Sequence, residues 1–416
     1  MKALIQFQSN RHRYQSVYSM VLLFLILWLM SKNVLSSSMW KDSLQYHAFI
    51  TQGIIKTDEN RFFGHSDTGS AALIELGING SSRINTQLMI SAQLLARRAG
   101  EMYDGSAELD YGLIDYTIHS DASKRYGVRL GRFKNPLGLY NDTRDVAFTR
   151  PGVFMPQTIY FDNLRNAFLS NDGVLIYTDL WGDESSISLQ VGIGRTPVDL
   201  NLEYALVGDD VSGYIDDEDL TLISRILYEA GNTRLALSYV NTSFRMKDTD
   251  PVLVSDGEFN VDIWILSLQH FISDWTLTTE WARQPIKWND FSTLYPAGSS
   301  GSNKPGGYFL QASYQLKNNW EILLRYEEGY ADSDDKDGTA RSAALASPPF
   351  NINSPAHNYF TKDWVIGTRW DITSQFMLRA EFHSVEGTYI LSRRENNIET
   401  TVKDWKLFSI LGSYRF

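Results

Sequence analysis

The chain has 416 residues, no cysteine, and a formal net charge of −11 from 38 Lys and Arg against 49 Asp and Glu. Without cysteine there is neither a disulfide framework nor a thiolate metal site, and the acidic balance excludes a generally basic nucleic-acid binder. Aromatic residues make up 13% of the chain. After residue 30, no apolar run reaches the length of about 20 residues that a membrane-spanning helix requires.

Residues 1–38 are predicted to be a secretory signal peptide. A positively charged lead-in that includes Arg13 precedes an apolar run over residues 21–30, and the small residue Ser38 suits an export peptidase. This three-part order is typical of export signals. The alternative is a transmembrane anchor, but Lys32 follows the apolar run too soon for a helix that crosses the membrane.

Residues 39–416 are predicted to form one closed antiparallel β-barrel that crosses a membrane. Apolar and polar residues alternate repeatedly, as where Leu189 and Val191 alternate with Ser188 and Gln190. Successive strand residues point to opposite faces, so each such segment has one apolar and one polar wall. The residues predicted to face lipid include Leu88, Ile90, Leu189, Val191, Leu237, Ile322 and Leu324.

The connections favour a barrel of about 16 strands over a soluble sandwich. Candidate strands begin near Leu44, Ser70, Arg83, Leu109, Arg125, Gly173, Ser185, Leu220, Thr233, Phe259, Trp275, Gly306, Trp320, Asn358, Phe376 and Trp405. Every second connection is a short turn, the first of them at residues 79–82, and those between are long and polar. Bacterial outer-membrane barrels have short periplasmic turns and long extracellular loops, and no segment remains for an N-terminal plug.

The longest connection, residues 134–172, is predicted to fold into the barrel as a constriction loop. Its apolar and aromatic residues, among them Phe148, Phe154 and Tyr160, indicate a packed loop. A barrel of 16 strands encloses a channel wide enough for such a loop. The alternative is an external loop that packs on its neighbours or on a partner subunit.

Charged residues on the polar faces are predicted to line the lumen. On the strands these are Arg129, Arg225, Arg234, Arg325, Arg369 and Arg379, with Glu280, Glu321, Glu327 and Glu381. The loop adds Lys134, Arg144, Arg150 and Arg165, offset by Asp142, Asp145 and Asp162. Opposed charges across a pore select solutes by sign and size. The alternative is that these charges only neutralise one another across adjacent strands.

The final strand carries a second candidate signal. Phe408, Ile410, Tyr414 and Phe416 fall on one face and end with the chain. This ending resembles the terminal aromatic signal that the barrel-assembly machinery reads in outer-membrane proteins. The resemblance implies that this machinery is a partner.

The segment Gly-Arg-Phe-Lys-Asn-Pro at residues 131–136, the loop after it and the topology resemble the porin superfamily, most of all phosphate-selective porin-like proteins. The resemblance covers nearly the whole mature chain. It implies a passive pore, often a homotrimer, whose third loop lines the constriction. Phosphate-selective members have dense Arg and Lys along the lumen, whereas the mixed charges here predict only a mild anion preference.

The expected function is therefore passive diffusion of small hydrophilic solutes across the bacterial outer membrane, without cofactor or metal. The alternative is a structural or adhesive barrel that does not conduct. An enzyme is not expected, because no histidine lies in a recognisable Ser-His or Asp-His motif. Lipid and lipopolysaccharide are the expected surroundings, and the acidic loops at 209–219 and 332–338 are expected to be solvated or to bridge lipopolysaccharide through divalent ions.

Overall fold

The computed structural model describes residues 43–208, 213–216, 219–247, 256–292, 299–348 and 350–416. The predicted signal peptide, residues 1–38, lies outside these ranges, as does part of the acidic loop at 209–219. Within the described residues, none of the helices combines the length and the apolar character needed to cross a membrane.

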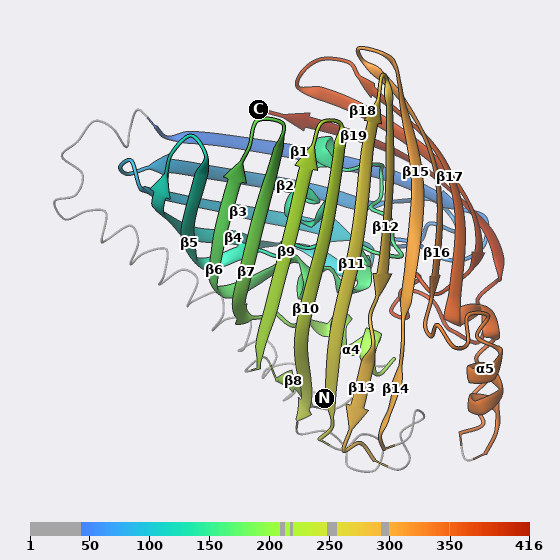
Figure 1. Ribbon diagram of the computed structural model, residues 1–416. Helices are drawn as coiled ribbons and strands as arrows, with labels where there is room; N and C mark the ends of the chain where they lie inside the picture. Colours follow the sequence, from blue (N-terminus) through green and yellow to red (C-terminus); the bar gives the residue numbers. More distant parts are fainter. Residues whose placement is uncertain (1–42, 209–212, 217–218, 248–255, 293–298, 349) are drawn as a thin grey trace.

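One antiparallel sheet closes on itself to form a barrel (Figure 1). Each long strand pairs with the next along the chain, and β1 pairs with β19 to complete the ring. The long strands are β1 (Gln45–Thr57), β2 (Ser70–Arg83), β3 (Leu88–Ala99), β4 (Tyr103–Ser120), β5 (Lys124–Lys134), β6 (Ser170–Trp181), β7 (Ser185–Arg195), β9 (Leu220–Ala230), β10 (Thr233–Lys247), β11 (Glu258–Ile272), β12 (Trp275–Arg283), β15 (Gly306–Lys317), β16 (Trp320–Tyr330), β17 (Phe360–Asp371), β18 (Phe376–Gly387) and β19 (Asp404–Arg415).

Three further strands are short extensions at the loop-side rim: β8 (Tyr214–Asp216), β13 (Ile286–Asn289) and β14 (Gly301–Asn303). Subtracting these three from the nineteen strands of the sheet leaves sixteen that form the wall. The predicted 16-strand antiparallel barrel is thus confirmed.

The two faces of the wall differ as the alternation predicts. On β10, Leu235 and Leu237 are each 41% exposed on the outside, whereas Ser238 is fully buried on the inside. The outward residues along the other strands are likewise large and apolar, including Leu189, Val191, Ile322 and Leu324. An apolar exterior of this kind faces hydrocarbon in a membrane barrel.

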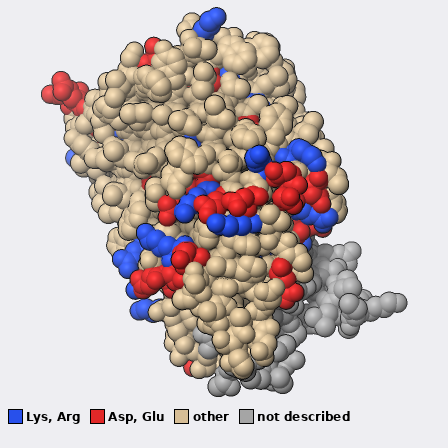
Figure 2. Space-filling view, turned by 90° about the vertical axis from the view of Figure 1, so that its right-hand side faces the viewer, with Lys and Arg blue, Asp and Glu red and all other residues tan. Residues whose placement is uncertain are grey.

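Charged side chains are sparse over the upper part of the face shown in Figure 2 and gather across its middle and lower part. Lys362 and Glu386 lie on the outward faces of β17 and β18, near the loop-side ends of these strands. Glu386 forms ion pairs with Lys362 at 3.7 Å and with Lys403 at 2.7 Å. Ion pairs in this position are consistent with the boundary between hydrocarbon and the polar headgroups.

Two predicted boundaries are wrong. Residues 79–82 lie within β2, and the turn spans residues 84–87, so β3 begins at Leu88 and not near Arg83. Polar residues that suggest a turn are suited to the inner wall of a barrel: Asn79 donates to Gln93 Oε1 on β3 at 3.1 Å.

The second error concerns the start of β4, which is at Tyr103 and not near Leu109. Residues 100–102 alone connect β3 to β4, so this connection is short although a long loop was expected. Register shifts between β3 and β4 interrupt the alternation there, at Gln93/Leu94 and Ala96/Arg98. A bulge of this kind inserts an extra residue and hides the period of two.

The long connection after β5 contains four short helices: η1 (Asn141–Thr143), η2 (Ala147–Thr149), η3 (Asp162–Leu164) and α3 (Arg165–Leu169). The remaining helices lie in later loops: α4 (Leu200–Leu206), α5 (Thr339–Ala346) and η4 (Ala356–Tyr359). In Figure 1, the turquoise segment after β5 runs within the ring of strands.

Candidate functional site

The third loop is attached to the inner wall at β9, β10 and β12. Gly138 donates its N–H to Ser238 Oγ at 3.0 Å, and Leu139 donates its N–H to Glu280 Oε1 at 2.9 Å. Arg225 donates to the Gly138 carbonyl at 3.0 Å. Gly138 has φ +58°, and a Cβ there would overlap the Tyr160 hydroxyl and Glu280. Only glycine adopts this backbone without strain and also leaves room for the contact.

The same loop is also attached at β16 and β18. Val153 donates its N–H to Glu381 Oε1 at 2.8 Å, and Thr158 donates its N–H to Glu327 Oε2 at 3.0 Å. Farther along the ring, Arg150 of the loop donates to both carboxylate oxygens of Glu75 on β2, at 2.6 and 2.7 Å. Because β2 lies seven strands from β10 in the ring of sixteen, the loop spans the lumen and contacts the wall on opposite sides.

Ion pairs also fix the loop internally and to β5. Asp145 pairs with both Lys134 and Arg165. Burial by itself would raise the pKa of Asp145, but Lys134 and Arg165 outweigh it and hold this pKa below its usual range. Asp162 is likewise buried, yet Arg97 and Arg144 lower its pKa. Both carboxylates are therefore charged in the folded protein at neutral pH.

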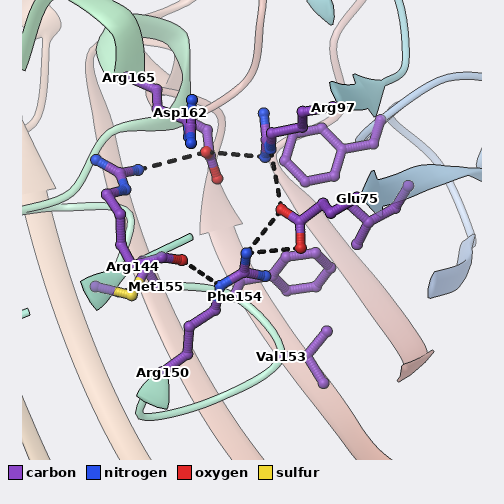
Figure 3. Close-up of a pocket in the computed structure, with 11 residues that line it drawn as sticks. Glu75, Arg97, Arg144, Arg150, Val153, Phe154, Met155, Asp162 and Arg165 are labelled. Atoms are coloured by element: carbon purple, nitrogen blue, oxygen red, sulfur yellow. Dashed lines mark hydrogen bonds and ion pairs between the residues drawn. The ribbon is translucent and has the colours of Figure 1, made fainter. Parts of the chain in front are cut away.

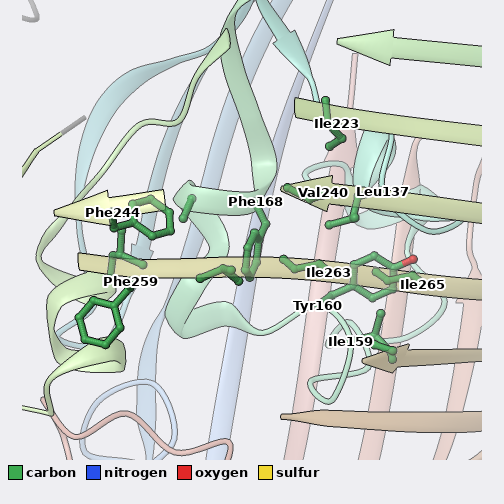
Figure 4. Close-up of a cluster of buried hydrophobic side chains, with 14 of the residues drawn as sticks. Leu137, Ile159, Tyr160, Phe168, Ile223, Val240, Phe244, Phe259, Ile263 and Ile265 are labelled. Atoms are coloured by element: carbon green, nitrogen blue, oxygen red, sulfur yellow. The ribbon is translucent and has the colours of Figure 1, made fainter. Parts of the chain in front are cut away.

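An apolar cluster holds one side of the loop against β9, β10 and β11 (Figure 4). Ile159 and Tyr160 of the loop belong to the same buried cluster as Val240, Ile263 and Ile265 of the wall. These wall residues make the inner face apolar at this point. The alternation rule does not predict this patch, but β11 carries a signal for it: apolar residues at both odd and even positions, which indicate burial on both faces.

Other loops cover the third loop at the mouth. The Glu395 carboxylate accepts N–H groups from Phe63 at 3.0 Å, from Gly64 at 2.8 Å and from Glu101 at 2.8 Å. Burial raises the pKa of Glu395, in opposition to these hydrogen bonds. Arg394 donates to Asn201 Oδ1 at 2.7 Å and so joins the last loop to α4. None of these contacts was predicted from sequence.

The acidic loop at 332–338 also has structural contacts. The Asp335 carboxylate accepts N–H groups of Ala340 at 3.0 Å and Arg341 at 2.8 Å, in the first turn of α5. Asp334 pairs with Lys304 at 2.6 Å. In the described part of the chain, no group of three or more His, Asp or Glu side chains is arranged to hold a metal.

The predicted lumen residues all lie on the inner face or in the loop, but they divide into two sets. Eleven are at most 9% exposed: Arg144, Arg150, Arg165, Arg225, Arg325, Arg379, Glu280, Glu327, Glu381, Asp145 and Asp162. Six are less buried: Arg129, Lys134, Arg234, Arg369, Glu321 and Asp142. In the first set, Arg325 pairs with Glu327 at 3.2 Å and Arg225 with Asp142 at 2.7 Å. The first pair lies within β16 and the second joins β9 to the loop, so neither is the pairing across adjacent strands that the alternative interpretation describes.

The less buried arginines lie toward the short-turn rim and are also paired. Arg129 pairs with Asp115 at 2.9 Å, Arg369 with Asp371 at 3.0 Å and Arg234 with Glu229 at 2.6 Å. Their side chains retain 30%, 23% and 49% of their exposure, respectively. They can therefore meet a solute that enters this end of the lumen.

Three of the four residues of the predicted assembly signal, Phe408, Ile410 and Tyr414, lie on β19, and Phe416 directly follows its last residue. Phe408 and Ile410 are 46% and 43% exposed on the outer face, and Phe416 at the chain end is 67% exposed. Tyr414 has the same parity and packs edge-on against Phe416, with ring centroids 4.8 Å apart. Strand β19 pairs with β1 at the closure of the barrel.

The closed ring, apolar exterior and inserted third loop give this chain the fold of a transmembrane β-barrel with a loop inside its lumen. The chain matches no protein-family model and no curated protein sequence. Solved structures with this fold include the anion-selective porin from Comamonas acidovorans, at 12% identity and TM-score 0.54 over 90% of this chain and 99% of that one. The outer-membrane channel DcaP of Acinetobacter baumannii has the same identity and TM-score, over 90% and 97%. The outer-membrane protein OmpT of Vibrio cholerae has 10% identity and TM-score 0.53, over 90% and 97%.

Proposed function

We propose that this protein is a narrow channel of the bacterial outer membrane through which small hydrophilic solutes diffuse passively. The observation that carries the proposal is the third loop, held inside a closed barrel by hydrogen bonds to Ser238 of β10 and Glu75 of β2, on opposite sides of the ring. A barrel of this size without such a loop encloses a wide aqueous lumen. Residues 134–172 then set the width of the passage.

The proposed selectivity is a mild preference for anions. Three of the less buried lumen cations, Arg129, Arg234 and Arg369, each have a carboxylate partner, so the field they exert on a passing ion is weak. Such a lumen separates ions by sign only modestly. The anion-selective porin from Comamonas acidovorans shares this fold, which is consistent with the proposal.

A second candidate function is a structural or adhesive barrel that does not conduct. It is favoured by the contacts that join the third loop to the wall, and by the burial of eleven of the seventeen predicted lumen residues. On this proposal the third loop is a permanent plug. The outward surface is the same in both cases, with lipid and lipopolysaccharide as surroundings and a homotrimer as the proposed assembly.

Planar-bilayer recording of the purified protein separates the two functions. Stepwise conductance that is absent after heat unfolding would support the channel, and a reversal potential in a salt gradient would give its selectivity. Lack of steps from correctly folded protein would favour the plugged barrel. A reversal potential of the sign for cations would reject the anion preference and leave the channel itself standing.

A further inference from the structure

A small cavity lies between the third loop and strands β2 and β3 (Figure 3). Its polar lining consists of Glu75, Arg97, Arg144, Arg150, Asp162 and Arg165. The cavity volume is about 10 Å³, which is close to the space that one water-sized particle needs. The cavity can therefore hold one small species and no larger ligand.

The charges around this cavity do not balance. The lining has four arginines and two carboxylates. Following the ion pairs outward, Arg165 reaches Asp145, Asp145 reaches Lys134, and Lys134 reaches Asp110. The connected network then has five cations and four carboxylates, which leaves one positive charge in excess.

Arg97 is held rigidly at this cavity. Its Nε donates to Glu75 Oε1 and its Nη2 to Asp162 Oδ1, both at 3.1 Å. The guanidinium carbon also lies 4.9 Å from the centre of the Tyr103 ring and 5.4 Å from that of Phe63. Three of its sides are thereby fixed, so the position of the remaining nitrogen, Nη1, is determined.

The Nη1 of Arg97 is buried and has no hydrogen-bond partner among the described residues. Arg97 as a whole is only 8% exposed. A buried charged donor without an acceptor is costly, because the water it lost is not replaced. An acceptor in the cavity would remove that cost.

The pKa of Arg144 is consistent with the same excess of positive charge. The pKa of Arg144 is lowered to about 10, chiefly by burial; Asp162 opposes this, and Arg165 and Arg97 add to it. Glu75 does not relieve this, since it already accepts two hydrogen bonds from Arg150, at 2.6 and 2.7 Å.

We propose that this cavity binds one small monovalent anion, with chloride as the physiological ligand, through Arg97 Nη1. A chloride ion would supply both the missing acceptor and the missing negative charge. Water would supply only the acceptor, and a polyatomic anion such as phosphate or a carboxylate needs more room than a single halide ion. The ion would fasten the third loop to β2 and β3, so the inference goes beyond the channel function and does not require conduction.

The first test measures the thermal unfolding of the detergent-solubilised protein in sodium chloride and in sodium gluconate at equal ionic strength. Gluconate is too large for the cavity, so only chloride should stabilise the fold by binding. Above the dissociation constant, each tenfold increase in chloride should then raise the unfolding temperature by a constant increment. Equal unfolding temperatures in the two salts at every concentration would overturn the proposal.

Two neighbouring arginines provide the variant and its matched control. Arg97→Gln removes the proposed ligand and should abolish the difference between chloride and gluconate. Arg98→Gln changes the next residue, which is exposed on the outer face, and should leave that difference intact. A chloride effect that persists in Arg97→Gln would place the ion elsewhere and contradict the proposal.

A third test uses the wild-type protein and so does not depend on whether a variant folds. Crystals grown in sodium bromide should show an anomalous bromide peak next to Arg97 Nη1, within the cavity of Figure 3. An ordered water at that position with no anomalous signal would overturn the proposal. Neither test depends on conductance, so a protein that does not conduct could still bind the anion.

Discussion

Val153 in the third loop and Glu381 in strand β18 are joined by a hydrogen bond of 2.8 Å from the Val153 N–H to Glu381 Oε1. The other carboxylate oxygen of Glu381 lies 3.3 Å from His383 Nε2, and His383 Nδ1 lies 2.7 Å from Asp363. A buried chain of charged groups thus connects the tip of the loop to two wall strands. The loop is held by specific bonds as well as by apolar packing.

Glu381→Gln should loosen this attachment. The amide replaces one acceptor oxygen with a donor, which faces either the Val153 N–H or His383 and leaves a buried group unsatisfied. We expect a loss of about 1–3 kcal/mol in unfolding free energy and more frequent brief current fluctuations. Urea unfolding and single-channel recording measure the two effects.

Glu386→Gln is the matched control on the same strand. Its side chain is 36% exposed on the outer face and pairs with Lys362 and Lys403. Exposed ion pairs contribute about 0–1 kcal/mol, so little change is expected. If both variants behaved alike, the bond between Val153 and Glu381 would not be what holds the loop.

Deletion of residues 140–160 should raise the single-channel conductance. This segment contains the contacts of the loop with β16 and β18, while the wall strands pair continuously without it. The lumen should therefore widen while the barrel persists. Conductance steps in planar bilayers measure the change, and retained strand content by circular dichroism shows that the barrel still forms. An unchanged conductance in a folded variant would mean that the loop does not limit the passage.

The strands could be predicted because a barrel wall imposes a period of two on its sequence, with lipid on one side and polar groups on the other. That rule gave the inward orientation of Arg325 and the outward orientation of Leu324. The period-two rule did not predict the start of β4, because a bulge shifts the period before Arg98. It also did not predict the apolar part of the inner wall at Ile263 and Ile265.

The contacts of the lumen could not be predicted in the same way. The position of a residue in the period-two pattern of a strand predicts which face of the wall it lies on. It does not predict how deeply the side chain is buried or which residue it contacts across the ring. Glu381 and Val153 are 228 residues apart, and Arg97 meets Asp162 only because the loop crosses the lumen. Whether a lumen arginine is solvated or buried therefore depends on the path of the loop, which no local pattern encodes.

The third loop should stay attached in mildly acidic solution. Asp145 and Asp162 have pKa values below the usual range in the folded state. Their stabilising effect is therefore complete above the unfolded value of about 3.9 and is lost as the pH falls through the lower folded value. Conductance should change little between pH 7 and about 4.5 and should increase only below about pH 4. An increase near pH 6 would show that other groups hold the loop.

The contribution of Glu395 to stability should depend on pH in the opposite sense. Its pKa is raised in the folded state, so the charged form disfavours folding, and stability increases as the pH falls through that value. Unfolding free energy should thus rise slightly on mild acidification, before Asp145 and Asp162 are protonated. The rise should be absent in Glu395→Gln, whose side chain does not titrate.

Arg129→Gln should shift the selectivity toward cations. Arg129 is among the less buried lumen arginines, and its removal leaves the Asp115 charge uncompensated near the path. Arg132→Gln is the control on the same strand, since Arg132 pairs with the exposed Asp172 on the opposite face. Reversal potentials in a salt gradient measure the shift. Equal shifts in the two variants would indicate a general surface-charge effect.

Leu189→Arg should destabilise the barrel in a membrane. Leu189 is 38% exposed on the outer face near the middle of β7, where arginine on the lipid face costs about 2–4 kcal/mol. Ser188→Arg places the same charge one residue earlier, on the inner face, where Ser188 already bonds to Asp179 at 2.7 Å. That variant should remain stable, because water and a carboxylate meet the charge. Folding free energies in lipid vesicles measure the difference. If Ser188→Arg proved the more damaging change, the assignment of inner and outer faces on β7 would be reversed.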